Sequence, residues 1–106
     1  MTIISRKVDE SLMIGKRLMV KVTDIDSTGA RLWVRGQCVG GPDDGQELDR
    51  AFELGISGEL RLGDLICINI ARVAVTESRV YLSVNAPRHF EVLRKEIFDT
   101  MSHDTL

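Results

Sequence analysis

Apolar and polar side chains alternate over several short stretches in the first third of the chain. The clearest case is residues 17–22, where Leu18, Val20 and Val22 alternate with charged or less apolar neighbours. A period of two residues is typical of a strand with one buried face. We therefore predict strands over residues 1–8, 12–14, 18–22 and 30–34, connected by short polar turns such as residues 26–29, as in a β-meander.

The same pattern returns after residue 58. Residues 60–64 are similar to residues 12–16, the alternation of residues 66–70 matches that of residues 18–22, and residues 79–84 match residues 30–34 with about two extra residues in the preceding turn. This self-similarity predicts a diverged internal duplication. The expected organisation is a first copy over 1–36, a linker over 37–58, a second copy over 59–101 and a tail over 102–106.

The segment between the two copies differs in composition. Residues 36–45 hold four of the nine glycines and one of the two prolines, which predicts a loop. Residues 47–54 are compatible with a short helix and equally with a strand, and the sequence leaves this choice open. Residues 37–64 carry two basic and seven acidic side chains, whereas residues 1–36 carry seven basic and four acidic ones. This asymmetry permits a local anion-binding face in a chain whose net charge is −2.

The stretch from residue 80 to residue 101 predicts three elements in succession. An alternating strand enters, Asn85-Ala86-Pro87 breaks it, and a short strand follows around residues 90–92. Leu93, Ile97 and Met101 then recur at helical spacing. Arg94 lies at the junction of strand and helix, where a guanidinium can hold an anion.

Composition narrows the classes of protein. The chain is 43% hydrophobic but only 5% aromatic, which indicates an aliphatic core. No apolar run reaches the roughly 18 residues of a membrane span, and no leader is apparent, so we expect a cytoplasmic protein. Cys38 and Cys67 are isolated and have no histidines at metal-binding spacing, so we expect no metal and no cofactor.

Two motifs resemble one known family. Residues 3–15, Ile-Ile-Ser-Arg-Lys-Val-Asp-Glu-Ser-Leu-Met-Ile-Gly, and the Asn-Ala-Pro followed by Arg-x-Glu-Ile at residues 94–97 are similar to the opening and the end of the carbon storage regulator (CsrA/RsmA) family of bacterial RNA-binding proteins. The resemblance covers roughly residues 1–34 and 63–101. It implies a mainly β fold with CsrA-like antiparallel sheets, here from two fused degenerate copies that form a pseudo-dimer with a C-terminal helix.

The resemblance also implies a binding site. Family members are intertwined homodimers that recognise GGA-containing loops of messenger leaders, and each site combines the first strand of one subunit with the fifth strand of the other. In this chain only the first copy has a clear first strand, and only the second has the fifth strand. We therefore predict a single composite site. Carried over by position, its residues are Ile4, Ser5, Arg6 and Lys7 on one side and Asn85, Ala86, Pro87, Val92, Leu93, Arg94 and Glu96 on the other.

Some positions depart from the family pattern. Ile-Ser replaces the usual Leu-Thr at residues 4 and 5, Asp9 a usual glycine, Leu93 a usual histidine and Lys95 a usual glutamate. These changes affect the expected affinity and target sequence more than the fold. Arg6 and Lys7 could alternatively protect a strand edge against aggregation, and Arg94 could be a plain surface arginine.

The leading interpretation is a non-catalytic RNA-binding regulator of messenger leaders, with a small regulatory RNA as a further possible partner. The main alternative is an interaction protein that pairs with or antagonises an ordinary two-site homologue, or associates with itself. A β-rich DNA-binding regulator is less favoured because no recognition helix is visible. An enzyme is least favoured, since the sequence has no nucleophile and base pair, metal cluster or Gly-rich phosphate loop.

Overall fold

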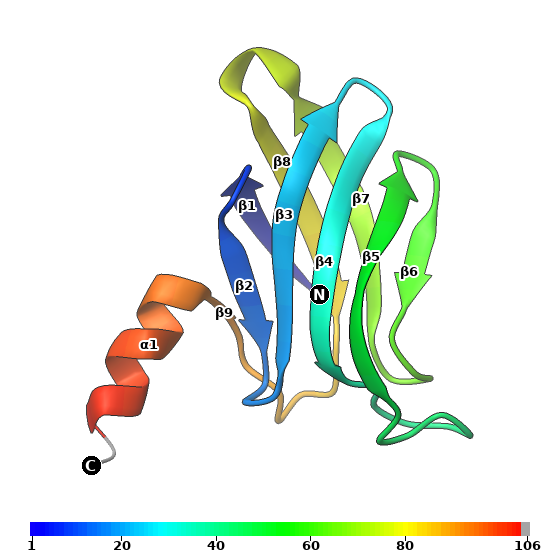
Figure 1. The fold of residues 1–106 in the computed structure, drawn as a ribbon, viewed down its shortest axis with the longest axis vertical. Coiled ribbons are helices and arrows are strands. Elements are labelled where there is room, and N and C mark those ends of the chain that lie inside the picture. Colours follow the sequence, from blue (N-terminus) through cyan, green and yellow to red (C-terminus); the bar gives the residue numbers. More distant parts are fainter. Residues whose placement is uncertain (105–106) are drawn as a thin grey trace.

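The computed structural model describes residues 1–104, and their side chains as far as residue 101. Two antiparallel sheets pack face to face (Figure 1). The four-stranded sheet has the order β1 (Thr2–Lys7), β8 (Arg79–Asn85), β7 (Cys67–Ala74) and β6 (Glu59–Arg61). The five-stranded sheet has the order β5 (Glu47–Gly55), β4 (Gly29–Gln37), β3 (Leu18–Asp26), β2 (Ser11–Ile14) and β9 (Val92–Arg94). The mainly β fold with antiparallel sheets and a C-terminal helix that the sequence predicted is confirmed.

The core lies between the two sheets and is aliphatic. The inward-facing members of each alternating stretch are fully covered, among them Val20 and Leu32 from one sheet and Ile68 and Leu82 from the other. Their neighbours along the strands face outward, as in β4, where Arg31, Trp33 and Arg35 are exposed. The period of two therefore places one face of each strand in the core and the other in solvent.

The two halves of the chain repeat the same geometry. Strands β2, β3 and β4 form consecutive antiparallel pairs, and β6, β7 and β8 do the same. Each of the ladders β3–β4 and β7–β8 contains a register shift, between Val22 and Asp24 in one and between Ile70 and Arg72 in the other. The turn after the second shift is longer and contains a short 3₁₀ helix, η1 (Val75–Glu77). The two halves thus share the order of their strands and the place of the register shift, and the duplication stays a prediction.

For residues 47–54 the sequence allowed either a helix or a strand, and the structure has strand β5 there. This stretch is a strand and not a helix, and all nine of its residues pair with β4. It occupies the place in the five-stranded sheet that β1 occupies in the four-stranded sheet, next to β4 and β8 respectively. The expectation that the second copy has no first strand is therefore wrong. The second part of the predicted linker, Glu47–Gly55, is therefore part of the sheet.

The end of the chain differs slightly from the prediction. The short strand begins at Val92, later than expected, because Phe90 packs against Gly15 instead of extending the ladder. Helix α1 (Lys95–Asp104) extends into the predicted tail, and residues 105–106 lie outside the described part of the chain. No helix among the described residues is long and apolar enough to cross a membrane.

Gly36 provides a test of the close packing at the end of β4. Its φ is +143°, and a Cβ there would lie 2.1 Å from the carbonyl oxygen of Arg17. We expect Gly36→Ala to lower the free energy of unfolding by about 3 kcal/mol, because backbone atoms must move apart. Gly45, with φ +82° and nothing within 4 Å of a Cβ, is the control and should cost about 1 kcal/mol as alanine. Equal losses in urea unfolding would contradict the packing argument.

Candidate nucleic-acid interface

Two edge strands, one from each sheet, lie on the same side of the molecule. Strand β1 ends the four-stranded sheet and β9 ends the five-stranded sheet (Figure 1). Arg94 of β9 pairs with Leu12 of β2, which is fully buried, so the Arg94 side chain leaves the sheet on its inner face, the face toward the other sheet. Leu93 leaves on the outer face and lines a cavity with Phe98 and Met101 of α1. The side of β9 that carries Arg94 therefore faces the space beside β1.

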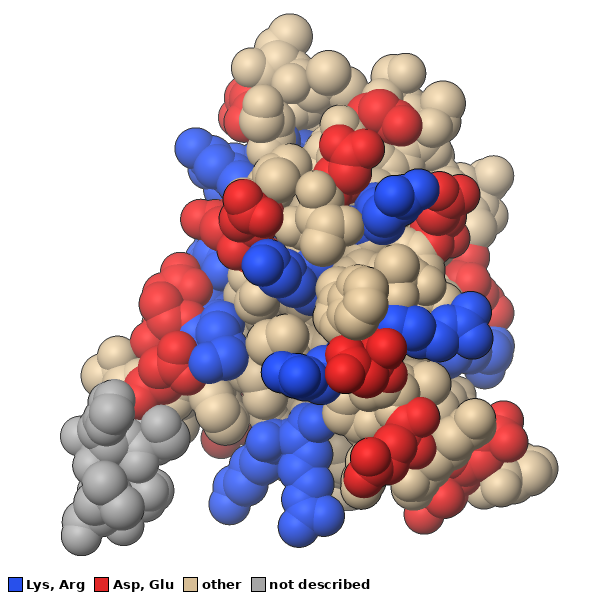
Figure 2. Space-filling view, in the orientation of Figure 1, with Lys and Arg blue, Asp and Glu red and all other residues tan. Residues whose placement is uncertain are grey.

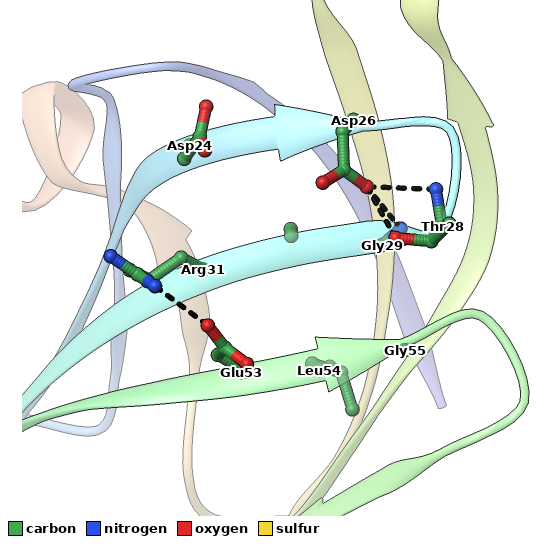
Figure 3. A pocket seen from close by; sticks show the side chains of 9 residues that line it. Asp24, Asp26, Thr28, Gly29, Arg31, Glu53, Leu54 and Gly55 are labelled. Carbon is green, nitrogen blue, oxygen red and sulfur yellow. Dashed lines mark hydrogen bonds and ion pairs between the residues drawn. The ribbon is translucent and has the colours of Figure 1, made fainter.

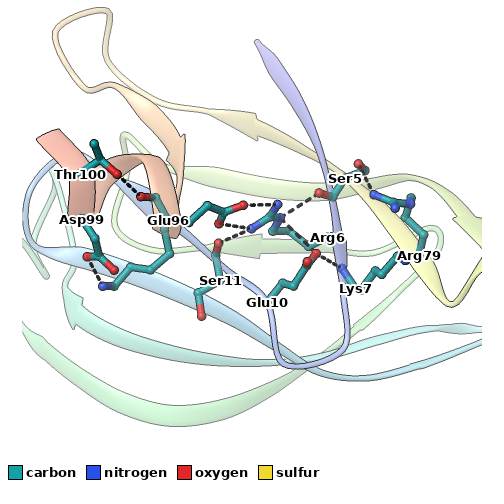
Figure 4. Close-up of polar contacts among 10 residues, drawn as sticks. Ser5, Arg6, Lys7, Glu10, Ser11, Arg79, Glu96, Asp99 and Thr100 are labelled. Carbon is teal, nitrogen blue, oxygen red and sulfur yellow. Dashed lines mark hydrogen bonds and ion pairs between the residues drawn. The ribbon is translucent and has the colours of Figure 1, made fainter.

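Arg6 links β1 to β2 and to the start of α1, which follows β9 in the chain (Figure 4). Its guanidinium donates two hydrogen bonds to the Glu96 carboxylate, at 3.0 and 3.3 Å, and one each to the carbonyls of Ser5 and Ser11, at 2.8 and 2.9 Å. Only 3% of Arg6 is exposed, and Glu10 approaches the same guanidinium at 3.7 Å. A buried arginine normally has its charge and donors matched in this way. The Arg6 side chain thus connects the first strand to the start of α1.

The hydrogen bond from Arg6 is the main reason that the pKa of the Glu96 carboxyl lies below its ordinary value of 4.5. A carboxyl with a lowered pKa in the folded state stabilises the protein above the pKa of the unfolded chain, and this contribution disappears as the pH falls through the folded-state value. We expect Glu96→Gln to destabilise the protein at pH 7 and the difference from wild type to shrink progressively below about pH 4.5. Urea unfolding at a series of pH values tests this. A difference that stays constant to pH 3 would contradict it.

The structure brings the residues assigned to the site by resemblance to one side of the molecule, but their exposure differs. Lys7, Asn85, Arg94 and Glu96 are exposed; Ser5, Ala86, Pro87, Val92 and Leu93 are half-buried; Ile4 and Arg6 are buried. The guanidinium of Arg6 is therefore not available to a ligand in this arrangement, and Ser5 accepts a hydrogen bond from Arg79 at 2.9 Å. Contacts from β1 to a ligand would come from its backbone and from Lys7.

The partners of the basic side chains divide them into two groups. Most arginines are already engaged: Arg31, Arg35 and Arg61 form ion pairs with acidic neighbours, and Arg50 and Arg72 lie over the rings of Phe52 and Tyr81. The basic side chains with no hydrogen bond, ion pair or aromatic-ring contact to another described residue are Lys7, Lys16, Arg17, Lys21, Arg88 and Arg94. All but Lys21 lie on β1, on β9 or on the turns next to β9 and β2. Sequence analysis had not singled out Lys16 and Arg17, although their adjacent charges after Gly15 are visible in the sequence.

The opposite side of the molecule has the same backbone arrangement with different side chains. Counted from the first residue of β4 and of β8, the partners in β5 that correspond to Ser5, Arg6 and Lys7 are Glu53, Leu54 and Gly55. Leu54 is buried as Arg6 is. Strand β6, which corresponds to β2, has no strand on its other side among the described residues. This side thus contains a first strand without the basic residues, and no fifth strand.

The charged side chains that line the cavity on this opposite side are mainly acidic, and the polar groups of the cavity form hydrogen bonds and ion pairs with one another (Figure 3). It measures about 230 Å³ and is lined by Asp24, Asp26, Arg31 and Glu53, among others. Asp26 accepts hydrogen bonds from the Thr28 hydroxyl and from the backbone N–H groups of Thr28 and Gly29, and the first of these is the main cause that lowers its pKa. Arg31 is held by Glu53 at 2.6 Å. The site has no free cation for an anionic ligand.

The fold is that of a small two-sheet β protein, and its candidate site lies on the side where β1 and β9, the edge strands of the two sheets, are found. Comparison with protein families identifies residues 56–103 as CsrA, the global regulator protein family. This match covers most of the second half of the chain, agrees with the family resemblance of the sequence, and relates these residues to a family of post-transcriptional regulators. Neither the curated proteins nor the solved structures gave a match.

Proposed function

We propose that this protein is a cytoplasmic RNA-binding regulator that recognises GGA-containing single-stranded or hairpin-loop segments of messenger leaders through one composite site between β1 and β9. The observation that carries the proposal is the distribution of unpaired cations. Lys7, Arg88 and Arg94 form no hydrogen bond or ion pair with another described residue around this site, and Arg94 acts on Glu96 only through its charge, whereas the exposed arginines of the opposite side are held by carboxylates or aromatic rings. Cations without partners are available to neutralise phosphates.

The edge strands supply the second part of the proposed recognition. Both β1 and β9 have one unpaired edge, which presents backbone N–H and C=O groups at the regular spacing of a strand. Such groups can form hydrogen bonds with the edges of unpaired bases, which is how RNA sequence is mainly read. Arg94 adds a planar donor that fits a phosphate or the O6 and N7 atoms of guanine. The opposite side offers an edge strand with Glu53 and Gly55 in the corresponding positions, so we expect it not to bind RNA.

The test is a titration of the protein with a hairpin that carries GGA in its loop, combined with light scattering for the mass of the complex. We expect one hairpin per chain. A hairpin with the same stem and a loop of uridines should bind about tenfold more weakly or worse, because discrimination through base edges is worth about 1–3 kcal/mol per good contact. Two hairpins per chain, or equal affinity for both loops, would contradict the proposal.

A second candidate is a partner protein of an ordinary two-site homologue, and one observation favours it. The edge of β6 is open at the position where β9 pairs with β2 in the other sheet, so a strand from another chain could add there. The charged pair Glu59 and Arg61 on this three-residue strand limits such pairing. The test is to mix this protein with a purified two-site homologue. A stable complex of the two, together with weak RNA binding by this chain alone, would favour the partner role over direct regulation.

A further inference from the structure

The turn between β2 and β3 lies directly beside the composite site and carries two exposed cations, Lys16 and Arg17. We propose that this turn binds backbone phosphates of the RNA that flanks the recognised loop. The inference rests on the proposed function, since it extends the path of the same RNA. It assigns to Lys16 and Arg17 a role in affinity and salt dependence and none in reading the sequence.

The turn is held rigidly against the segment that leads into β9. The Gly15 N–H donates a hydrogen bond to the Glu91 carbonyl at 2.8 Å. Gly15 has a φ of +66°, and a Cβ at this position would lie 2.9 Å from the Phe90 ring, so only glycine allows the ring to lie so close. The His89 ring meets the Phe90 ring edge-on at a centroid distance of 4.7 Å. Lys16 and Arg17 therefore start from a backbone whose position is fixed relative to residues 89–91.

Two cavities border Lys16 and give a ligand room, and a third borders Arg17 together with Glu47 and Asp49. One, of about 390 Å³, is lined by Lys16, Arg17, His89 and Phe90, with Cys38 and Asp44 at its other end. The other, of about 320 Å³, is lined by Lys16, His89 and Glu91 together with apolar side chains of β9 and α1. The carboxylates of Asp44 and Glu91 border these cavities but form no ion pair with either cation of the turn. The positive charge at the turn is thus uncompensated within 4 Å.

The turn lies next to residues 87–89, which carry another cation without an ion pair to a described residue, Arg88. Pro87 belongs to the proposed site, Arg88 and His89 follow it and are exposed, and His89 lines both cavities beside Lys16. Arg94 pairs with Leu12, and β2 continues from Leu12 to Ile14, after which the turn with Lys16 and Arg17 begins. Figure 2 shows basic side chains projecting from the lower end of the molecule on this side and acidic ones on the other. An RNA several nucleotides longer than the recognised loop would reach the turn.

The experiment compares wild type with the double variant Lys16→Gln, Arg17→Gln on three RNAs: a short GGA oligonucleotide, a GGA-loop hairpin, and an oligonucleotide with unpaired flanks of the same length as the hairpin. We expect the variant to bind the hairpin roughly tenfold more weakly at 0.1 M salt, with a salt slope lower by about 1.4–1.8, since each phosphate contact contributes about 0.7–0.9. The short oligonucleotide should bind equally well to both proteins. Loss on the unpaired-flank RNA alone would identify a single strand as the occupant, and loss on the hairpin alone a base-paired stem.

Two further variants separate this inference from the proposed function. Lys21→Gln removes an equally unpaired cation from the outer face of β3 and should leave both affinity and salt slope unchanged. Arg94→Ala should weaken all three RNAs. If the double variant matches wild type on every RNA while Arg94→Ala still weakens binding, the phosphate contact at the turn is wrong and the composite site stands. If the folded wild-type protein binds none of the RNAs, both proposals fall.

Discussion

Replacing Arg6 by alanine is expected to lower the free energy of unfolding by about 3 kcal/mol. The substitution removes four hydrogen bonds, leaves the carbonyls of Ser5 and Ser11 without their side-chain donor, and opens a cavity beneath the start of α1. The Glu96 side chain is 62% exposed, so its carboxylate can be hydrated by solvent once Arg6 has been removed. No buried charge is therefore left unpaired, and the loss should lie at the lower end of the range for broken buried pairs.

Arg31 provides the matched control, because it forms an ion pair of similar geometry in solvent. Its guanidinium lies 2.6 Å from the Glu53 carboxylate, and both side chains are more than half exposed. We expect Arg31→Ala to leave the free energy of unfolding nearly unchanged, because solvent-exposed ion pairs contribute little to stability. Arg6→Leu should recover about half of the loss of Arg6→Ala, since Leu54 fills the corresponding position of the other sheet. Urea unfolding of the three variants that found equal losses for Arg6→Ala and Arg31→Ala would refute the role assigned to Arg6.

Arg94→Ala is expected to weaken binding of a GGA-loop hairpin by about 2 kcal/mol, which is close to 30-fold. The Arg94 side chain is exposed beside β1 and forms no hydrogen bond or ion pair with another described residue, so its donors are free for a base or a phosphate. For the same reason the free energy of unfolding should change by no more than about 0.5 kcal/mol. A loss of affinity would then reflect the missing contact and not a damaged fold.

The control for Arg94 is Arg50→Ala, on the edge strand of the opposite side. Arg50 is also an exposed arginine, but its guanidinium lies 4.4 Å from the centroid of the Phe52 ring. We expect Arg50→Ala to bind the hairpin as wild type does at 0.15 M salt, where charges beyond about 8 Å are screened. If the two variants lost affinity equally, RNA would not be confined to the side of β1 and β9, and the single-site proposal would fail.

The parts of β3 and β7 that precede their register shifts could be predicted from the sequence, and β5 could not. In β3 and β7 each inward position is apolar, so the sequence has the period of two residues that is typical of a strand and not the period of a helix. In β5 the inward positions include Arg50 between Leu48 and Phe52, and only Leu54 is fully buried. Arg50 can lie there because its guanidinium covers the Phe52 ring at the sheet edge. This contact between Arg50 and Phe52 forms only when β5 has become the edge strand of the folded sheet. A short window of sequence therefore does not reveal it.

The candidate site, too, could be predicted from the sequence only in part. The resemblance at both ends of the chain indicated which residues to bring together, and the structure places them on one side. The burial of Arg6 could not be foreseen, because a basic residue on a predicted edge strand is ordinarily exposed. Its burial depends on Glu96, which lies 90 residues away along the chain, and on the Ser11 carbonyl. Contacts of such sequence separation are decided by the packing of the two sheets and not by local pattern.

This separation also determines when the site can exist. Strand β1 is synthesised first, but its partner strand β8 and the Glu96 carboxylate that holds Arg6 are made only near residues 79–96. At about 5–20 residues per second, a nascent chain spends several seconds with β1 unpaired. The long-range pairing then has to form before the edges meet, and such topologies fold slowly. The arrangement of β1, β8 and Glu96 therefore cannot form before the last quarter of the chain has been synthesised.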